Sequence, residues 1–218
     1  MLNQDTILEK TIFYVQQELA QAEGGHDWWH IYRVWKMAKH IAQHEEVDLF
    51  VVELGALLHD IADAKFHGGD ESIGPRKARA FLESLTVPEN TIQQVENIIL
   101  HISFKGGNEA SPFYSPELAV VQDADRLDAI GAIGIARAFN YGGFKNRALY
   151  DPAIPPKLDM TKEEYKASQA PTINHFYEKL LLLKDRMNTK TGKAIAEKRH
   201  QFMEVFLEEF YREWEAEL

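Results

Sequence analysis

Residues 53–66 read Glu53-Leu54-Gly55-Ala56-Leu57-Leu58-His59-Asp60-Ile61-Ala62-Asp63-Ala64-Lys65-Phe66. The apolar residues Leu54, Leu58 and Ile61 recur at steps of four and three, which predicts a helix with one buried face. We expect this helix to span about residues 48–63. An adjacent His and Asp inside such a helix are costly to bury unless they are paired or bind a metal. The segment therefore predicts a core helix that carries metal ligands near its end.

The composition limits what kind of protein this is. The chain has 218 residues, no cysteine and a formal net charge of −10. This length suits one domain with a substantial core, so we expect a single domain over residues 1–218. The negative charge argues against binding to nucleic-acid polymers or anionic membranes. The lack of cysteine excludes thiolate metal sites and favours a reducing, cytoplasmic setting, and no apolar run approaches the ~20 residues of a membrane span.

Apolar residues at helical spacing continue through the rest of the chain, and we find no alternation typical of strands. We therefore expect an all-α bundle of about eight helices with no sheet. Asp5 and Asp27 are the expected N-caps of the first two helices. A later helix is expected to open at Ser115-Pro116-Glu117, and Gly131 and Gly134 are expected to bend or break it before Ala138. Residues 140–171 are rich in Gly and Pro and predict a loop or lid. The other helices are expected over about 5–22, 74–85, 88–102, 173–187 and 191–217, with a short one near 161–165.

Four polar side chains lie where the helical pattern would place apolar residues, namely His30, His59, Asp60 and Asp125. For each one alone, a side chain satisfied by hydrogen bonds is the commoner explanation, but four of them on three helices favour a metal site. Asp123 and Asp128 are alternatives to Asp125, which the periodicity favours. Two imidazoles and two carboxylates suit Mn²⁺, Fe²⁺, Co²⁺, Ni²⁺ or Zn²⁺, whereas Mg²⁺ is less natural for nitrogen ligands.

This ordered set resembles the motif of the HD-domain superfamily of metal-dependent phosphohydrolases, which is a His, then His-Asp on a later helix, then a distal Asp. The resemblance covers about residues 25–138 and implies an HD-type helical bundle. It also implies that His30, His59, Asp60 and Asp125 hold a divalent metal. The similar segments are His30-Ile31-Tyr32-Arg33-Val34, Leu57-Leu58-His59-Asp60-Ile61-Ala62 and Asp123-Ala124-Asp125-Arg126-Leu127-Asp128. Within the superfamily, the chain is similar to small stand-alone bacterial members, some of which hydrolyse nucleoside triphosphates to the monophosphate and pyrophosphate.

Further residues are expected to act on a phosphorylated substrate. Asp63 matches the family position for an acidic proton shuttle or water-orienting group, although pairing with Lys65 at a helix end explains it equally well. Arg33 is the strongest phosphate-binding candidate because it lies one turn from His30. The other candidates are Lys65, His101, Lys145 and Arg147, although a solvated loop position is the commoner explanation for the last two. For Trp28, Trp29 and Phe104 a helix-staple or core role is the commoner explanation, and stacking of a base is the alternative.

The expected function is therefore that of a metal-dependent phosphohydrolase acting on a small phosphorylated substrate, with a nucleotide favoured. By resemblance, we expect a nucleoside or deoxynucleoside triphosphate pyrophosphohydrolase. The alternatives within the superfamily are a nucleotidase, another phosphomonoesterase or a phosphodiesterase. A non-catalytic HD module that binds a nucleotide is the alternative from a different class. A homodimer and a monomer are both compatible with the sequence.

Overall fold

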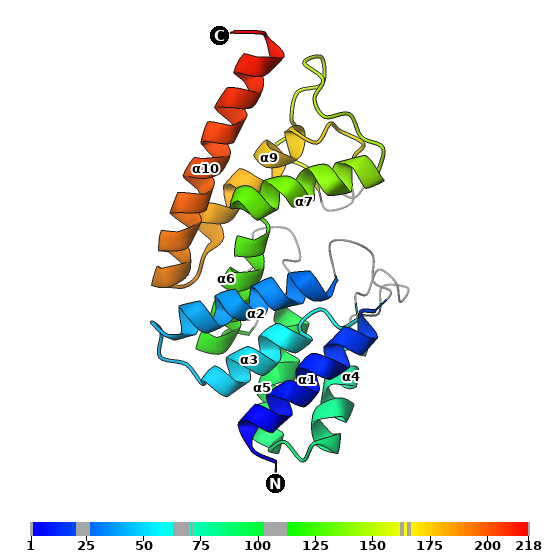
Figure 1. Ribbon diagram of the computed structural model, residues 1–218, viewed down its shortest axis with the longest axis vertical. Coiled ribbons are helices and arrows are strands. Elements are labelled where there is room, and N and C mark those ends of the chain that lie inside the picture. The colour runs from blue at the N-terminus through cyan, green and yellow to red at the C-terminus, as the bar shows by residue number, and fades with distance from the viewer. Residues whose placement is uncertain are drawn as a thin grey trace. The chain divides into compact units, whose positions relative to one another are not determined.

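A computed structural model describes residues 2–20, 27–62, 70, 72–102, 113–161, 164 and 167–217. Within these ranges all regular secondary structure is helical and no strand occurs (Figure 1). The prediction of an all-α fold without a sheet is confirmed. None of the helices described is both long and apolar enough to cross a membrane. The chain divides into two compact units, residues 1–124 and 125–218, and the single domain expected from the sequence stays a prediction.

The first unit is built around one helix that is buried along almost its whole length. This helix, α3, packs against α1, α2 and α5, while α4 packs against α5 (Figure 1). Every residue of α3 from Phe50 to Leu58 is buried. Such a helix needs neighbours on several sides, because no face of it tolerates water. The helices of this unit are α1 (Gln4–Glu18), α2 (Trp28–Ala42), α3 (Leu49–Leu58), α4 (Ile73–Ser84), α5 (Glu89–His101) and the first part of α6 (Pro116–Asp128).

The second unit is held by an aromatic core. The ring centroid of Phe139 lies 6.1 Å from that of Phe176 and 5.9 Å from that of Phe206, and Phe176 is fully buried. The long helix α10 packs against α7 and against a 3-10 helix, η2 (Figure 1). After the end of α6, the elements of this unit are α7 (Gly131–Phe144), α9 (Asn174–Glu178), η2 (Leu180–Arg186) and α10 (Lys190–Trp214).

The starts of α1 and α2 test the two predicted N-caps. Asp27 caps α2 as predicted, since its side chain accepts a hydrogen bond from His30 N at 3.0 Å. The predicted cap at Asp5 is wrong, because α1 begins at Gln4 and its cap is Asn3, whose Oδ1 accepts from Thr6 N at 2.8 Å. Asn and Asp are about equally good caps. Asp5 instead lies in the first turn, where a carboxylate still favours the positive end of the helix.

Gly131 opens α7, and Gly142 lies inside this helix near its end. The break predicted near Gly131 is confirmed, because α6 ends at Asp128 and Gly131 opens α7 with a φ of +76°, which disfavours other residues. The loop predicted from residue 140 begins later than expected, since α7 runs on to Phe144. Gly142 lies inside this helix, and a Cβ there would come within 2.1 Å of Thr172 Oγ1. Close packing, rather than loop flexibility, requires the glycine.

The helix expected over residues 173–187 is divided into the short α9 and the 3-10 helix η2. A break occurs at Lys179, whose φ of −146° is not helical. The short helix expected near residues 161–165 falls largely outside the described residues.

A buried ion pair joins α2 to α3. Glu53 is 5% exposed although it lies in the middle of the apolar α3. Its Oε1 accepts a hydrogen bond from Trp35 Nε1 at 2.9 Å and lies 2.7 Å from Lys39 Nζ. The Lys39 ammonium also lies 5.1 Å from the Trp35 ring centroid. These contacts satisfy the buried carboxylate and fix the position of α2 along α3.

This pair predicts an asymmetric effect of mutation. Lys39→Met should lower the free energy of unfolding by about 2–4 kcal/mol, because it leaves a buried carboxylate without its cation. Glu53→Gln should lower it by about 1 kcal/mol, because the amide still accepts from Trp35 and the Lys39 side chain, 37% exposed, can reach water. Urea unfolding followed by circular dichroism measures both values. A larger loss for Glu53→Gln than for Lys39→Met would contradict this account.

Candidate metal centre

The candidate centre lies where the start of α2 meets the end of α3. These helices pack against each other and are joined by a short connection, residues 43–48, so they run antiparallel. His30 is in the first turn of α2, and His59 is the residue that follows the last turn of α3. The antiparallel arrangement therefore brings the two imidazoles together. Their ring centroids are 5.4 Å apart, with an angle of 70° between the ring planes.

Three of the four predicted ligands converge. One ligand atom from each of His30, His59 and Asp60 lies within 4.8 Å of the others, and no other such group occurs among the described residues. His30 is 2% exposed and His59 8% exposed, while Asp60 is half-buried. Polar groups at this burial require partners. A cluster of this size and composition is suited to one divalent cation.

The hydrogen bonding of His59 fits metal binding. Its Nδ1 lies 2.8 Å from the carbonyl oxygen of Ala56. The carbonyl can only accept, so Nδ1 carries a proton, and the neutral form of a ring with this tautomer has its lone pair on Nε2. A second ring nitrogen that donates to a backbone carbonyl is the usual arrangement of a metal-ligating histidine. Two imidazoles and a carboxylate are donors preferred by the mid-series divalent ions.

The local backbone around the His-Asp pair differs from the prediction. The helix expected to reach Asp63 ends at Leu58, and His59 is its C-cap, with φ −59° and ψ −29°. His59 and Asp60 thus follow the helix instead of lying inside it. The last carbonyls of a helix lack partners from the helix itself, and the His59 side chain provides one for Ala56. Asp63 and Lys65 lie outside the described residues, and the expected spacing of Asp63 along an unbroken helix no longer applies.

The fourth predicted ligand, Asp125, lies on α6 and is half-buried. It is the first residue of the second unit, and its role as a ligand stays a prediction. The alternatives Asp123 and Asp128 are 0% and 4% exposed. The Asp128 carboxylate accepts a hydrogen bond from Arg137 of α7, which gives it a structural role within the second unit.

The predicted cations of the first unit are placed as follows. Arg33 is half-buried on α2, one turn after His30. His101 is the last residue of α5 and its ring stacks on Phe113, with 5.3 Å between the centroids and 24° between the planes. The backbone carbonyl of His101 accepts from Gln122 Nε2 at 2.9 Å. Arg33 therefore shares a helix with one candidate ligand, and His101 has a fixed ring orientation.

The predicted cations of the second unit have contacts of their own. Lys145 is exposed, and its ammonium lies 5.1 Å from the centroid of the Phe144 ring. Arg147 is half-buried and donates from Nη2 to the Ser168 carbonyl at 2.6 Å. Its guanidinium carbon lies 5.5 Å from the Tyr141 ring centroid. Arg147 also lies near the His175 ring, whose pKa is lowered to about 4 by burial and by the charges of Lys179 and Arg147. Arg147 thus has a structural role in the second unit.

Sequence reasoning assigned no role to Glu53, Trp35 and Lys39, which support the centre by fixing α2 against α3. The available signal was the single charged residue within the apolar run of residues 50–58. A buried acid in such a run requires a partner. Lys39 and Trp35 sit four residues apart on the preceding helix, at the spacing of neighbours on one face.

Known proteins resemble this chain over most of its length. Residues 28–130 match the HD domain family. The chain is 37% identical over 203 residues to the uncharacterised protein YpgQ of Bacillus subtilis strain 168, a match that covers 92% of this chain and 90% of YpgQ. An HD-superfamily hydrolase from Bacillus thuringiensis has a similar structure, with a TM-score of 0.80, 45% identity and coverage of 98% of this chain and 100% of that one. The crystal structure of YpgQ in complex with ADP gives a TM-score of 0.75 at 34% identity and covers 97% of both chains.

The centre predicts that metal content depends on His59 and Asp60. His59→Ala and Asp60→Ala should each lower the bound divalent metal more than about tenfold, because losing a direct ligand should exceed the ~10- to 100-fold effect of losing a supporting residue. The chain should stay folded, since neither side chain belongs to the apolar core. Metal analysis after equilibration with Mn²⁺, together with circular dichroism, measures both properties.

Asp185→Ala is a matched control, because Asp185 is an exposed acid on η2. Mn²⁺ should raise the melting temperature of the wild type and of this control, but not that of Asp60→Ala. Retention of full metal content by both site variants would refute the centre.

Proposed function

The chain belongs to the HD-domain family of metal-dependent phosphohydrolases, and on this basis we propose that it hydrolyses a nucleoside or deoxynucleoside triphosphate to the monophosphate and pyrophosphate. The convergence of His30, His59 and Asp60 is the observation that carries the proposal. The related YpgQ forms a crystalline complex with ADP, which supports a nucleotide as the substrate class.

Each residue of the centre has a distinct task in this proposal. His30, His59 and Asp60 hold a divalent ion, with Asp125 as the fourth ligand, and Mn²⁺, Fe²⁺, Co²⁺, Ni²⁺, Zn²⁺ and Mg²⁺ are the candidates. When bound, such an ion supplies a Lewis acid at the phosphoryl group and acidifies water. The Ala56 carbonyl holds His59 in the tautomer that has its lone pair on Nε2. The Asp27 side chain positions His30 by accepting a hydrogen bond from the backbone N–H of His30.

The substrate phosphates require local positive charge, because the chain as a whole carries −10 and repels anions. Arg33 is assigned to the phosphate nearest the metal ligands, since a guanidinium can bind two phosphate oxygens at once. His101 is assigned a second contact from the end of α5. More distant phosphates are assigned to Lys65, Lys145 and Arg147. A substrate with several phosphates makes use of this many cations, whereas a monophosphate does not.

Asp63 is assigned the proton-transfer step. It lies three residues after Asp60 in the sequence, so a short stretch of chain connects it to the ligands. A carboxylate near the attacked phosphorus can accept a proton from the attacking water or orient that water. Its expected effect is therefore on turnover rather than on metal affinity.

The bond that is cleaved can be identified with labelled water. Hydrolysis in H₂¹⁸O with Mn²⁺ should place ¹⁸O in the nucleoside monophosphate and release unlabelled pyrophosphate, because attack at the α-phosphorus leaves the new oxygen on that atom. Mass spectrometry of the products measures the label, and His59→Ala purified in the same way controls for contaminating enzymes. Release of orthophosphate would identify a nucleotidase or other phosphomonoesterase instead. No turnover with any of the candidate metals would support the non-catalytic nucleotide-binding module.

The role of Asp63 is tested separately. Asp63→Asn should lower kcat by about 10²- to 10⁴-fold, the range expected for a general acid or base, while the bound metal stays at the wild-type level. Steady-state kinetics and metal analysis on the same preparation provide the two values. Normal turnover in this variant would leave Asp63 with the structural role of pairing with Lys65.

A further inference from the structure

An aromatic cluster lies at the outer side of α2, at the same end of the helix as His30. The rings of Trp29 and Tyr32 meet edge to face, with centroids 5.9 Å apart and planes at 79°. The ring centroid of Trp28 lies 6.1 Å from that of Tyr32. Trp29 is 61% exposed and Tyr32 is 38% exposed. The core role considered for Trp29 from the sequence is therefore wrong. An indole with this exposure contributes little to folding but offers a flat apolar face to a ligand.

The residues of the first turns of α2 follow a definite order around the helix. With about 100° per residue, Arg33 lies about 60° and Trp29 about 100° from His30 in the same direction. Burial changes in the same order, since His30 is buried, Arg33 is half-buried and Trp29 is exposed. A metal ligand, a phosphate-binding cation and an aromatic face thus follow one another from the interior to the surface. Phosphate and base follow one another in the same way along a nucleotide.

We propose that Trp29, supported by Tyr32, is the platform on which the base of the nucleotide stacks. This inference rests on the proposed function and extends it by naming the group that distinguishes a nucleotide from other phosphorylated substrates. Tyr32 contacts the indole edge to face, and the indole remains 61% exposed. Stacking on an aromatic ring accepts any base, because every base has a π-face. The platform therefore recognises a base without selecting one.

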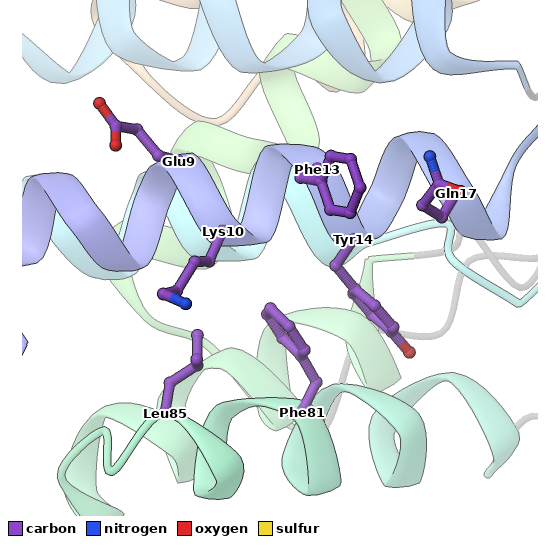
Figure 2. Close-up of a pocket in the computed structure, with 7 residues that line it drawn as sticks. All are labelled: Glu9, Lys10, Phe13, Tyr14, Gln17, Phe81 and Leu85. Atoms are coloured by element: carbon purple, nitrogen blue, oxygen red, sulfur yellow. The ribbon is translucent and has the colours of Figure 1, made fainter.

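A second apolar surface serves for comparison. A groove between α1 and α4 is lined by Phe13, Tyr14, Phe81 and Leu85, with Glu9, Lys10 and Gln17 beside them (Figure 2). Its Tyr14 and Phe81 rings already stack on each other, with centroids 4.1 Å apart and planes at 7°. None of these residues belongs to the candidate metal centre. Phe13, at 64% exposure, is thus an exposed aromatic residue of the same unit that should not contact the nucleotide.

The test compares ligands with and without a base. The probes are the non-hydrolysable α,β-methylene analogues of ATP and CTP, with inorganic tripolyphosphate as the ligand that lacks a base, all titrated calorimetrically in the presence of Mn²⁺. Trp29→Ala should weaken binding of both analogues by about 5- to 150-fold, the range for loss of one base–aromatic stack. Binding of tripolyphosphate should change less than about twofold, because its contacts are to cations and metal. Trp29→Phe should restore most of the affinity, and Phe13→Ala should leave it unchanged.

Several results would overturn the platform. An equal loss for the analogues and for tripolyphosphate would mean that Trp29 supports the centre structurally. Unchanged binding of the analogues by Trp29→Ala would remove Trp29 from the site while leaving the proposed function intact. A change of sedimentation mass in Trp29→Ala with unchanged affinity would assign the aromatic cluster to a contact between two copies of the chain. Failure of the wild type to bind either analogue, with tripolyphosphate bound normally, would overturn both the platform and the nucleotide substrate.

Discussion

The burial of α3 from Phe50 to Leu58 is the constraint on which the first unit depends. A helix with no solvent-facing side must be surrounded, so α1, α2 and α5 are required by its composition. Because α2 reaches it through a short connection, the two helices are antiparallel and their opposite ends meet. The polar residues at those ends therefore lie close together. Burying them inside the apolar core would be costly, and they lie instead at the end of the core helix.

The register between α2 and α3 is then set by polar contacts. Apolar helices can slide by a turn without a large loss of buried surface, whereas a buried carboxylate that needs both an indole N–H and an ammonium fits only one register. Glu53, Trp35 and Lys39 provide this constraint. A slip of α2 by one turn would separate His30 from His59 by about 5.4 Å along the axis. The ion pair is thus a means of holding two metal ligands at their distance.

The sequence predicted those parts of the structure that depend on local or repeating signals. Helical periodicity gave the all-α class, Asp27 was identified as a cap, and His30 was placed inward because it falls on an apolar face. Features set by distant contacts were not predicted. The glycine at 142 looked like a loop residue because its partner, Thr172, is thirty residues away in the sequence. Likewise, nothing in the periodicity of residues 53–63 shows that α3 stops at Leu58, and only the structure shows that Trp29 is exposed.

The hydrogen bond from His59 Nδ1 to the Ala56 carbonyl separates two properties that often change together in metal sites. One nitrogen of the ring caps the end of the helix, and the other is the candidate ligand atom. Loss of a metal ion from Nε2 would therefore leave the Ala56 carbonyl with its partner and the ring in its orientation. The apoprotein would retain a preformed site, so that metal could return without refolding of the helix end.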